Sequence, residues 1–279
     1  MERGVIISPY FTFDGRSLQF PGLVGIEPEH LRHYLLYWDR IEYPNNNLIH
    51  IGSSPDVQSL IDAGVMQRTI INLPSFAGNI GMAYVLCQAI AARQLNTAEP
   101  GKWTIAQSGP RLYLPDEISS PARSLEIELY NALPSPGVDV SLEDILSFKE
   151  RYRDELIAFR TYIDELYLEI SKSGDIPRAK TVAIQRLEKS INDVDRAADQ
   201  SWTSKLISGF KVELNLPTIF EKAAAGAGVA AVAGLPLALG AALGAASAVI
   251  KVELSLAPKV GGAPKDFAYL CHVKKELKS

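Results

Sequence analysis

Histidine and acidic residues near the N-terminus have the types and spacing that could support metal binding or acid–base chemistry. His30 and His33 are three residues apart, so a helix would place both imidazoles on one face. No further histidine or cysteine in this segment completes a ligand set, and we interpret both as surface or helix-capping histidines. His50 follows an apolar pair at the expected end of a strand, where functional groups often lie. It could pair in space with Asp39 or Asp56.

Motifs for nucleophilic catalysis and cofactor binding are missing from the sequence. Cys271 and His272 are neighbours, so their side chains diverge and do not form a nucleophile–base pair. The chain has no GxxxxGK[ST] loop, no nucleophile elbow and no HExxH motif. Residues 226–231 match GxGxxA, but dinucleotide-binding glycines follow a strand immediately, and here a long spacer intervenes. We therefore predict no catalytic residue, no cofactor and no metal ion.

The composition excludes several broad classes of protein. Hydrophobic residues make up 47% of the 279, which is enough apolar mass for a core and excludes a disordered chain. The net charge of −4 gives no overall basic field. Because Arg32, Arg40 and Arg68 are not clustered with aromatic residues along the chain, we predict no nucleic-acid partner. Two cysteines are too few for a disulfide framework, and the apolar run at residues 5–7 is too short for a signal peptide. We expect a cytoplasmic location.

Short strands alternate with helices over residues 1–140, which predicts a mixed α/β domain in a protein of the α+β class. Helices are expected to begin at Pro28 and at Ser54-Pro55, since proline suits the first helical turn, and a third is expected over 81–95. The segment Tyr37–Arg40 is interpreted as a core anchor with a salt bridge at a helix end. Strands are expected at Val5–Ser8, Leu48–Ile51, Trp103–Ala106, Arg111–Leu114 and Leu125–Leu129, with a hairpin around Asp14-Gly15, and Thr69–Leu73 is expected to be a strand or the end of a helix.

Residues 141–203 are predicted to form a coiled-coil-like antiparallel helical hairpin. Ser141 and Asp144 give it a start that resembles a capping box. Apolar residues then recur at spacings of three and four, at Ile145, Phe148, Tyr152, Leu156, Phe159, Ile163, Leu166 and Ile170, and again at Ile184, Leu187, Ile191, Val194 and Ala198. The short break at 173–177 favours antiparallel neighbours. Two interpretations stay open: an arm packed on the rest of the chain, or a surface at 145–198 that binds a second copy or a partner protein.

Residues 223–250 form a stretch without any charged side chain. They contain thirteen Ala and five Gly but only eight Leu, Val or Ile. The run exceeds the ~20 residues that cross a bilayer, yet its weak apolarity argues against a permanent anchor. Pro236 would bend a helix, and small residues recur every fourth position, a spacing that lets helices approach closely. The residues expected to contact lipid or support assembly are Gly226, Gly234, Pro236, Gly240 and Gly244.

Two similar segments flank this run at an offset of forty residues. Phe210–Pro217 reads FKVELNLP, and residues 250–258 read IKVELSLAP. Each alternates apolar and polar residues, as half-buried strands do. We expect the two strands to pair, which would bring the ends of the run together as an Ala/Gly-rich helical hairpin. Residues 204–279 are therefore predicted to form a C-terminal module.

Several segments resemble an uncharacterised family of bacterial proteins, a domain of unknown function. They are the N-terminal stretch that runs from Gly4–Pro9 to Leu35–Arg40, and the shorter segments Phe210–Leu214 and Phe267–Leu270. This resemblance implies a bacterial cytoplasmic origin and brings no activity or catalytic residue. Residues 223–250 are similar in composition to the hydrophobic hairpins of pore-forming colicins and of helical pore-forming toxins.

These features support three hypotheses about function. The leading one is a non-enzymatic, membrane-active effector in bacterial conflict or phage defence. In it the N-terminal domain senses or regulates, the helical hairpin assembles subunits, and residues 223–250 insert conditionally into membrane lipid. The second is a soluble assembly or scaffold protein in which the same run is buried as core. The third is an enzyme with a dispersed site near His50 and Asp56, in a cleft at the ends of the N-terminal strands.

Overall fold

The computed structural model describes residues 2–13, 18–20, 25–48, 50–73, 80–107, 111–113, 129–130, 133–197, 211–213 and 265–277. The uncharged run 223–250, with Gly226, Gly234, Pro236, Gly240 and Gly244, lies outside these residues. So does the second flanking segment, 250–258. The predictions made for both segments stay predictions. Among the described residues, no helix is both long and apolar enough to span a membrane.

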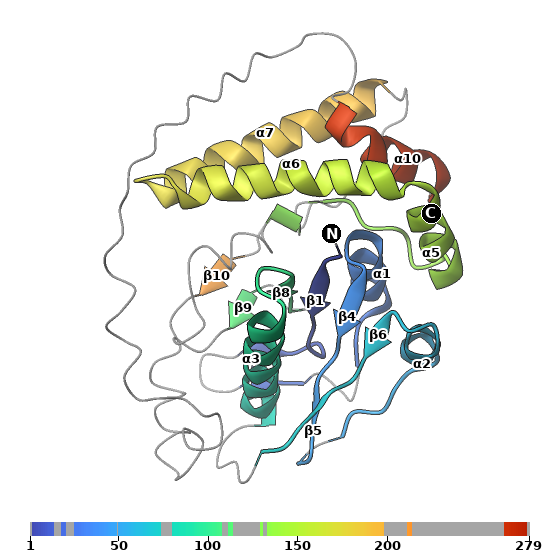
Figure 1. Ribbon diagram of the computed structural model, residues 1–279, viewed down its shortest axis with the longest axis vertical. Coiled ribbons are helices and arrows are strands. Elements are labelled where there is room, and N and C mark those ends of the chain that lie inside the picture. Colours follow the sequence, from blue (N-terminus) through green and yellow to red (C-terminus); the bar gives the residue numbers. More distant parts are fainter. Residues whose placement is uncertain are drawn as a thin grey trace.

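A four-stranded parallel sheet forms the centre of the N-terminal part (Figure 1). Its strand order is β6-β4-β1-β8, with Gly4 opposite both Arg40 and Trp103, and Ile41 opposite Met66. All three residues of β1 are buried, as expected for a strand that is covered on both faces. The strands are β1 (Gly4–Ile6), β4 (Arg40–Glu42), β6 (Met66–Gln67) and β8 (Trp103–Ile105).

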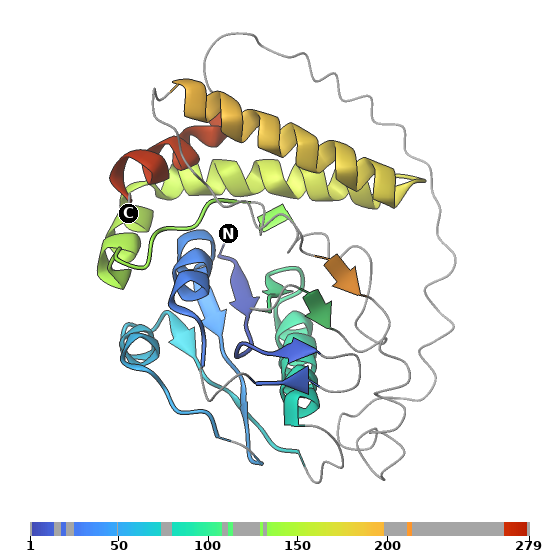
Figure 2. The ribbon, with the colours of Figure 1, turned by 180° about the vertical axis from the view of Figure 1, so that it is seen from behind.

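Helices cover both faces of this sheet (Figure 2). The apolar residues of α1 (Pro28–Tyr37) and α2 (Pro55–Asp62) pack with Val5, Ile41 and Met66 on one face. Those of α3 (Ile80–Ala98) pack with Ile6 and Trp103 on the other. The N-terminal part is therefore a three-layer arrangement in which helices alternate with parallel strands, as predicted.

Three smaller strand pairs surround the central sheet. β2 (Thr12–Phe13) pairs antiparallel with β3 (Leu18–Gln19), which confirms the predicted hairpin. β5 (Asn45–Asn46) and β7 (Ile70–Ile71) pair parallel beyond the ends of β4 and β6. β10 (Lys211–Glu213), in the first of the two similar flanking segments, pairs parallel with β9 (Arg111–Tyr113). This pairing joins a distant part of the chain to the N-terminal part.

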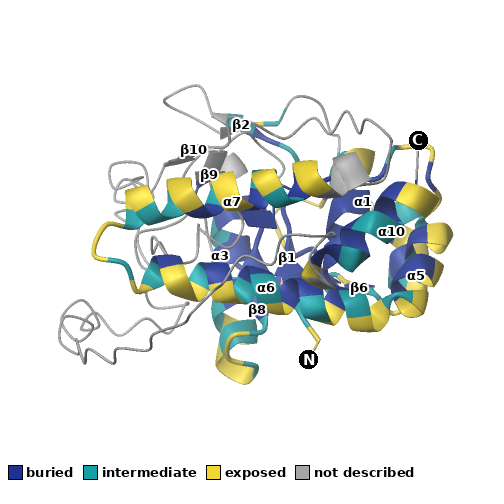
Figure 3. Ribbon diagram, turned by 90° about the horizontal axis from the view of Figure 1, so that it is seen from above, coloured by how far each residue is buried: buried dark blue, intermediate teal, exposed yellow. Residues whose placement is uncertain are grey.

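The helical arm consists of α5 (Leu142–Arg151), α6 (Arg153–Ser171) and α7 (Ile176–Ala197). Ser141 caps α5 by accepting a hydrogen bond from the Asp144 backbone N–H, at 3.0 Å. A short turn joins α6 to α7, and the two helices lie side by side as the predicted hairpin (Figures 1 and 2). Seen from above, both turn buried residues inward and exposed residues outward (Figure 3).

The C-terminal helix packs on this arm. A short 3-10 turn, η1 (Lys265–Phe267), leads into α10 (Ala268–Glu276), which contacts α6 and α7. Tyr269 is fully buried, and its hydroxyl donates to the Leu36 carbonyl at 2.8 Å. A single cluster of buried apolar residues runs from β1 and α1 through α5, α6 and α7 to α10. The arm is thus built into the same core as the sheet, while the boundaries at 140 and 203 stay predictions.

Three local predictions were wrong. Residues 48, 50 and 51 are not in a strand, and the strand that lies beside β1 is instead β4, at Arg40–Glu42. Leu129, the last residue of a predicted strand, is helical, and the rest of that strand lies outside the described residues. The first arm helix is interrupted at Tyr152, which leaves the helical region with φ −111° and ψ 35°. In each case contacts distant in sequence override a short local pattern.

Candidate functional site

Polar side chains gather where the four parallel strands end. Because these strands are parallel, the residues that follow them share one edge of the sheet, here called the carboxyl edge. From β1 the chain adds β4 and β6 on one side and then β8 on the other, so the strand order reverses at β1. Sheets of α/β proteins usually bind ligands at such a point. The carboxyl edge is therefore the first place to look for a site.

The point between β1 and β8 is closed by an amide network. Gln88 Nε2 donates to the carbonyls of Ile6 and Ala106, at 2.9 and 2.7 Å. Gln107 Nε2 donates to Gln88 Oε1 at 2.8 Å and to the Tyr113 carbonyl at 2.8 Å. Gln88 and Gln107 are both buried. Since these amides bond to each other and to the backbone, they rigidify the gap between β1 and β8.

Glu42, the last residue of β4, binds the chain just after β6. Its carboxylate is completely buried and accepts from the Thr69 backbone N–H and the Thr69 hydroxyl, both at 2.9 Å. Burial raises the pKa of Glu42, against the lowering effect of the Thr69 hydrogen bonds and the nearby Arg68 charge. The Glu42 carboxylate therefore fixes the backbone at Thr69, the residue after Arg68.

Arg68 directly follows β6, the outermost strand, and so lies at one end of the carboxyl edge, beside β4. Its guanidinium carbon is 4.4 Å from the centroid of the Tyr43 ring, a cation–π contact. Nη1 donates to the Ile51 carbonyl at 2.8 Å and to Ser53 Oγ at 3.1 Å, and Nε is directed at the Tyr43 carbonyl at 3.5 Å. Nη2 is buried and has no hydrogen-bond partner among the described residues.

Two tyrosines flank this guanidinium. The Tyr43 side chain is fully buried, and its hydroxyl has no hydrogen-bond partner among the described residues. Burial raises the pKa of Tyr43, so its hydroxyl stays protonated and able to donate. Burial also raises the pKa of Tyr84 to about 12, although the Arg68 charge and hydrogen bonds from Asn46 and Ile51 oppose the rise. Tyr43, Arg68 and Tyr84 are named the Tyr43–Arg68 corner below.

His50 also lies at this edge, beside Asn45. Its Nδ1 is 2.6 Å from Asn45 Nδ2, and the residue is exposed. The acids considered as partners for it lie elsewhere. Asp39 precedes β4 at the opposite edge, and Asp56, in the first turn of α2, lies 3.5 Å from Arg32. The structure thus places His50 with an amide rather than with a carboxylate.

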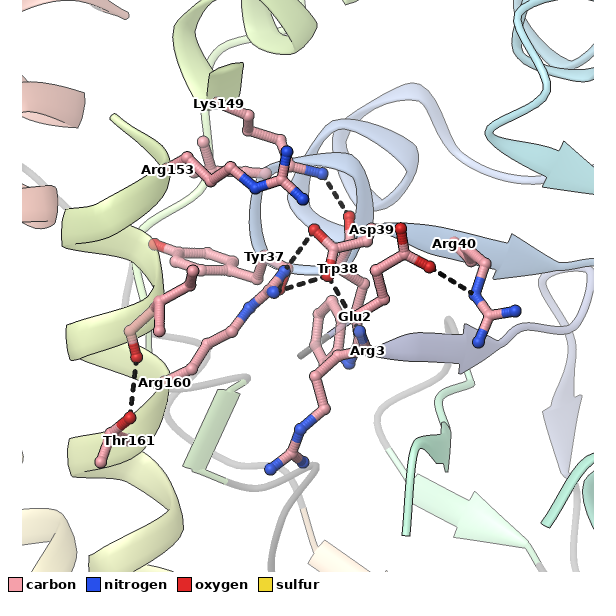
Figure 4. A network of polar contacts seen from close by, with 12 residues as sticks. Glu2, Arg3, Tyr37, Trp38, Asp39, Arg40, Lys149, Arg153, Arg160 and Thr161 are labelled. Atoms are coloured by element: carbon pink, nitrogen blue, oxygen red, sulfur yellow. Dashed lines mark hydrogen bonds and ion pairs between the residues drawn. The ribbon is translucent and has the colours of Figure 1, made fainter. Parts of the chain in front are cut away.

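The opposite edge carries a dense network of charges between the sheet and the arm (Figure 4). Arg160 of α6 donates to both oxygens of Asp39, at 2.7 and 3.2 Å, and to the Tyr37 carbonyl. Lys149 of α5 donates to the Trp38 carbonyl. The Asp39–Arg160–Lys149 network is named the arm joint below. It confirms that Tyr37–Arg40 is a core anchor with a salt bridge.

Protonation in the arm joint follows from burial and from neighbouring charges. Burial would raise the pKa of Asp39, but hydrogen bonding and charge from Arg160 hold it below its usual value. Burial lowers the pKa of Lys149 to about 7, and the Arg160 charge acts in the same direction. Because these groups bond to one another and to the backbone, the arm joint is a structural contact rather than a site.

The helix α1 histidines differ from the prediction. His33 is buried, not at the surface, and its Nδ1 lies 2.9 Å from Ser135 Oγ. Burial and the neighbouring His30 lower the pKa of His33 to about 3, so the ring is neutral. Aromatic neighbours such as Tyr37, at a ring distance of 5.0 Å, make it a core residue. Among the described residues no group of histidine, cysteine and acidic side chains could hold a metal ion.

One surface depression of about 360 Å³ lies away from the sheet, between α5 and the end of α10. Two of its charged groups are paired with each other, since Arg151 Nη1 contacts Glu276 Oε2 at 2.6 Å. His272 stacks on Tyr152, with ring centroids 3.9 Å apart, so it serves this packing and not the neighbouring Cys271. The depression offers no unpaired group comparable to those of the carboxyl edge.

The residues of the Tyr43–Arg68 corner were missed by the sequence analysis. Arg68 was considered only as one member of a basic surface, and Tyr43 was assigned no role. Arg40 and Arg68 in fact each lie over an aromatic ring, at 4.7 Å from Trp103 and 4.4 Å from Tyr43. The usable signal was a tyrosine and an arginine, each directly after a strand, but the two strands themselves were not predicted.

Comparison with known proteins gives a family and no activity. A family model described as a family of unknown function, DUF6236, matches residues 12–278. This confirms the resemblance inferred from the sequence. Neither the curated proteins nor the solved structures contain a match to the chain.

Proposed function

Since the chain belongs to the family of unknown function DUF6236, which brings no activity with it, we propose from the geometry that its α/β part binds a small polar ligand at the carboxyl edge. The observation that carries this proposal is a pair of buried donors there that have no hydrogen-bond partner among the described residues. They are Arg68 Nη2 and the Tyr43 hydroxyl.

Energetics support the proposal. A buried donor without an acceptor costs about 1–3 kcal/mol, and more when it is charged. Folded proteins rarely keep two such groups side by side unless a ligand or water satisfies them. Around the sheet, the buried side chains of Glu42 on β4 and Gln88 on α3 are hydrogen bonded, whereas Arg40 Nε on β4 is a further buried donor without a hydrogen-bond partner among the described residues. The incomplete bonding of Tyr43 and Arg68 therefore marks them as groups that await a partner.

The proposal is tested by amide hydrogen exchange on the full chain with a panel of small compounds. The panel contains ribonucleosides, ribonucleoside monophosphates, amino acids and hexoses at millimolar concentration. At least one compound is expected to slow exchange at residues 43–47 and 66–71, the backbone around the two unpaired donors. Arg68→Gln should remove this protection, whereas Arg186→Gln should keep it, because Arg186 is exposed on α7 and pairs with Glu169. Unchanged exchange at 43–47 and 66–71 with every compound would contradict ligand binding.

A second function, the membrane-active effector, rests on the composition of residues 223–250. In this proposal the α/β part responds to the ligand, residues 145–198 assemble subunits, and the uncharged run enters lipid on activation. Dye release from liposomes by the purified protein tests it, with Gly240→Asp as the control because a charge opposes insertion. Equal leakage by the Gly240→Asp variant would refute a role for the run. If the run is core instead, Gly240→Leu should overpack it and impair folding.

A further inference from the structure

We propose that the Tyr43–Arg68 corner is the subsite for a phosphoryl group of the ligand. This inference rests on the proposed function and adds the chemical class of the ligand. Three hydrogens are unused in the corner: two on Arg68 Nη2 and one on the Tyr43 hydroxyl. Both donors are buried, and the guanidinium lies over the ring that carries the hydroxyl, so the three hydrogens belong to one compact corner.

The charge of the corner selects an anion. No described carboxylate lies within ion-pair distance of the Arg68 guanidinium. The nearest acid that senses it, Glu42, is instead held by Thr69. A guanidinium stays charged at any ordinary pH. The corner thus holds a guanidinium that senses the charge of Glu42 but forms no ion pair with a described carboxylate, which favours an anion as its partner.

The directions of the donors favour phosphoryl oxygens over a carboxylate. A carboxylate is best bound by two parallel N–H groups from one edge of the guanidinium. Here Nη1 already bonds to Ile51 and Ser53, and Nε points to the Tyr43 carbonyl, so neither edge has both donors free. A phosphoryl group has three oxygens that can accept single hydrogen bonds from separate groups. The Tyr43 hydroxyl and Arg68 Nη2 are two such separate donors.

The corner is also fixed in advance of binding. Ile51 and Ser53 anchor one end of the guanidinium, and the Tyr43 ring supports its face. Tyr84 of α3 lies near enough for the Arg68 charge, Asn46 and Ile51 to lower the pKa of its hydroxyl. Little side-chain freedom is left to lose when a ligand binds, which favours affinity.

The experiment measures the melting temperature of the full chain in ribose 5-phosphate, ribose, inorganic phosphate and acetate, with ionic strength held constant by chloride. Ribose 5-phosphate and phosphate are expected to raise it in a saturable way, and ribose and acetate are not. Tyr43→Phe keeps the ring but removes one donor, so it should weaken phosphate binding about tenfold. Arg68→Gln should abolish it. Arg186→Gln should leave it intact.

Contrary outcomes separate this inference from the proposed function. If phosphate stabilises Tyr43→Phe, Arg68→Gln and the natural protein equally, its action is a general salt effect and the phosphoryl subsite is refuted. Acetate that matches phosphate would assign a carboxylate instead. A neutral compound that protects residues 43–47, without any effect of phosphate, overturns the subsite but leaves ligand binding standing. Circular dichroism identifies a variant that fails to fold, and Tyr43→Phe, with its ring retained, then decides.

Discussion

For the Tyr43 hydroxyl, we predict that removal raises the free energy of unfolding, whereas the loss of a buried hydroxyl usually lowers it. Removing a buried hydroxyl normally destabilises a protein because a hydrogen bond is lost. The Tyr43 hydroxyl has no partner among the described residues, so Tyr43→Phe removes a desolvation cost of about 1–3 kcal/mol. Lost dispersion contacts around one oxygen atom offset part of this gain. We expect the free energy of unfolding without ligand to rise by about 1 kcal/mol.

Tyr84→Phe is the matched control, because it removes the same atom from a neighbouring buried ring. The Tyr84 hydroxyl lies close enough to Asn46 and Ile51 for both to lower its pKa, so its loss should lower the free energy of unfolding by about 0.5–1.5 kcal/mol. Urea-induced unfolding in phosphate-free buffer measures both variants against the natural protein. A Tyr43→Phe variant that is destabilised as much as Tyr84→Phe would show that the Tyr43 hydroxyl has a partner, and the proposed subsite would lose its basis.

Three further predictions concern the arm joint and the start of β1. Asp39→Asn should lower the free energy of unfolding, measured in urea, by roughly 2–3 kcal/mol, which is below the ~3–5 kcal/mol of a fully buried pair because Arg160 is 6% exposed but Asp39 is 28% exposed. The free energy of unfolding should rise between pH 7 and 9, because the pKa of Lys149 in the folded protein, about 7, lies below its ordinary value of 10.5, so the unfolded state binds more protons. Lys149→Met should flatten this rise. Gly4→Ala should lower the melting temperature, because a Cβ there would lie 2.3 Å from the Trp103 ring and would overpack it at a cost of about 1–3 kcal/mol.

Controls for these variants are available in the chain. Gly52→Ala tests whether Gly4→Ala acts through packing, because a Cβ at Gly52 would meet nothing within 4 Å. Glu169→Gln removes an acid from an exposed pair with Arg186 and should change stability far less than Asp39→Asn. A natural protein whose stability is flat from pH 7 to 9 would contradict the buried, partly neutral state of Lys149.

Features that depend on neighbouring residues were predictable from the sequence. Ser54 caps α2 and Ser141 caps α5 as expected, because each hydroxyl meets a backbone N–H three residues ahead. The seam of the arm is buried in the same way, since its spacing of three and four matches the helical turn. The α+β class follows from the same local patterns.

Features that depend on distant contacts were not predictable. β4 has a single apolar residue, Ile41, between two charged ones, so it reads as the end of a helix. Its charges are acceptable only because Arg40 pairs with Glu99, 59 residues away, and Glu42 bonds to Thr69, 27 residues away. The Tyr43–Arg68 corner joins residues 25 apart across two unrecognised strands, and no local pattern reveals it.

The position of β4 gives a last prediction, which connects the ligand site to the arm. The strand has three residues, with Asp39 of the arm joint just before it and Tyr43 of the ligand corner just after it. Because this short segment is mostly buried and pairs with a strand on each side, we expect a change at one end to affect the other. We expect a phosphorylated ligand at Tyr43 to slow amide exchange in α6 around Arg160, and Asp39→Asn to abolish that effect while the ligand still protects residues 43–47. Exchange in α6 that is unchanged by a ligand bound at 43–47 would show that the two edges of the sheet act independently.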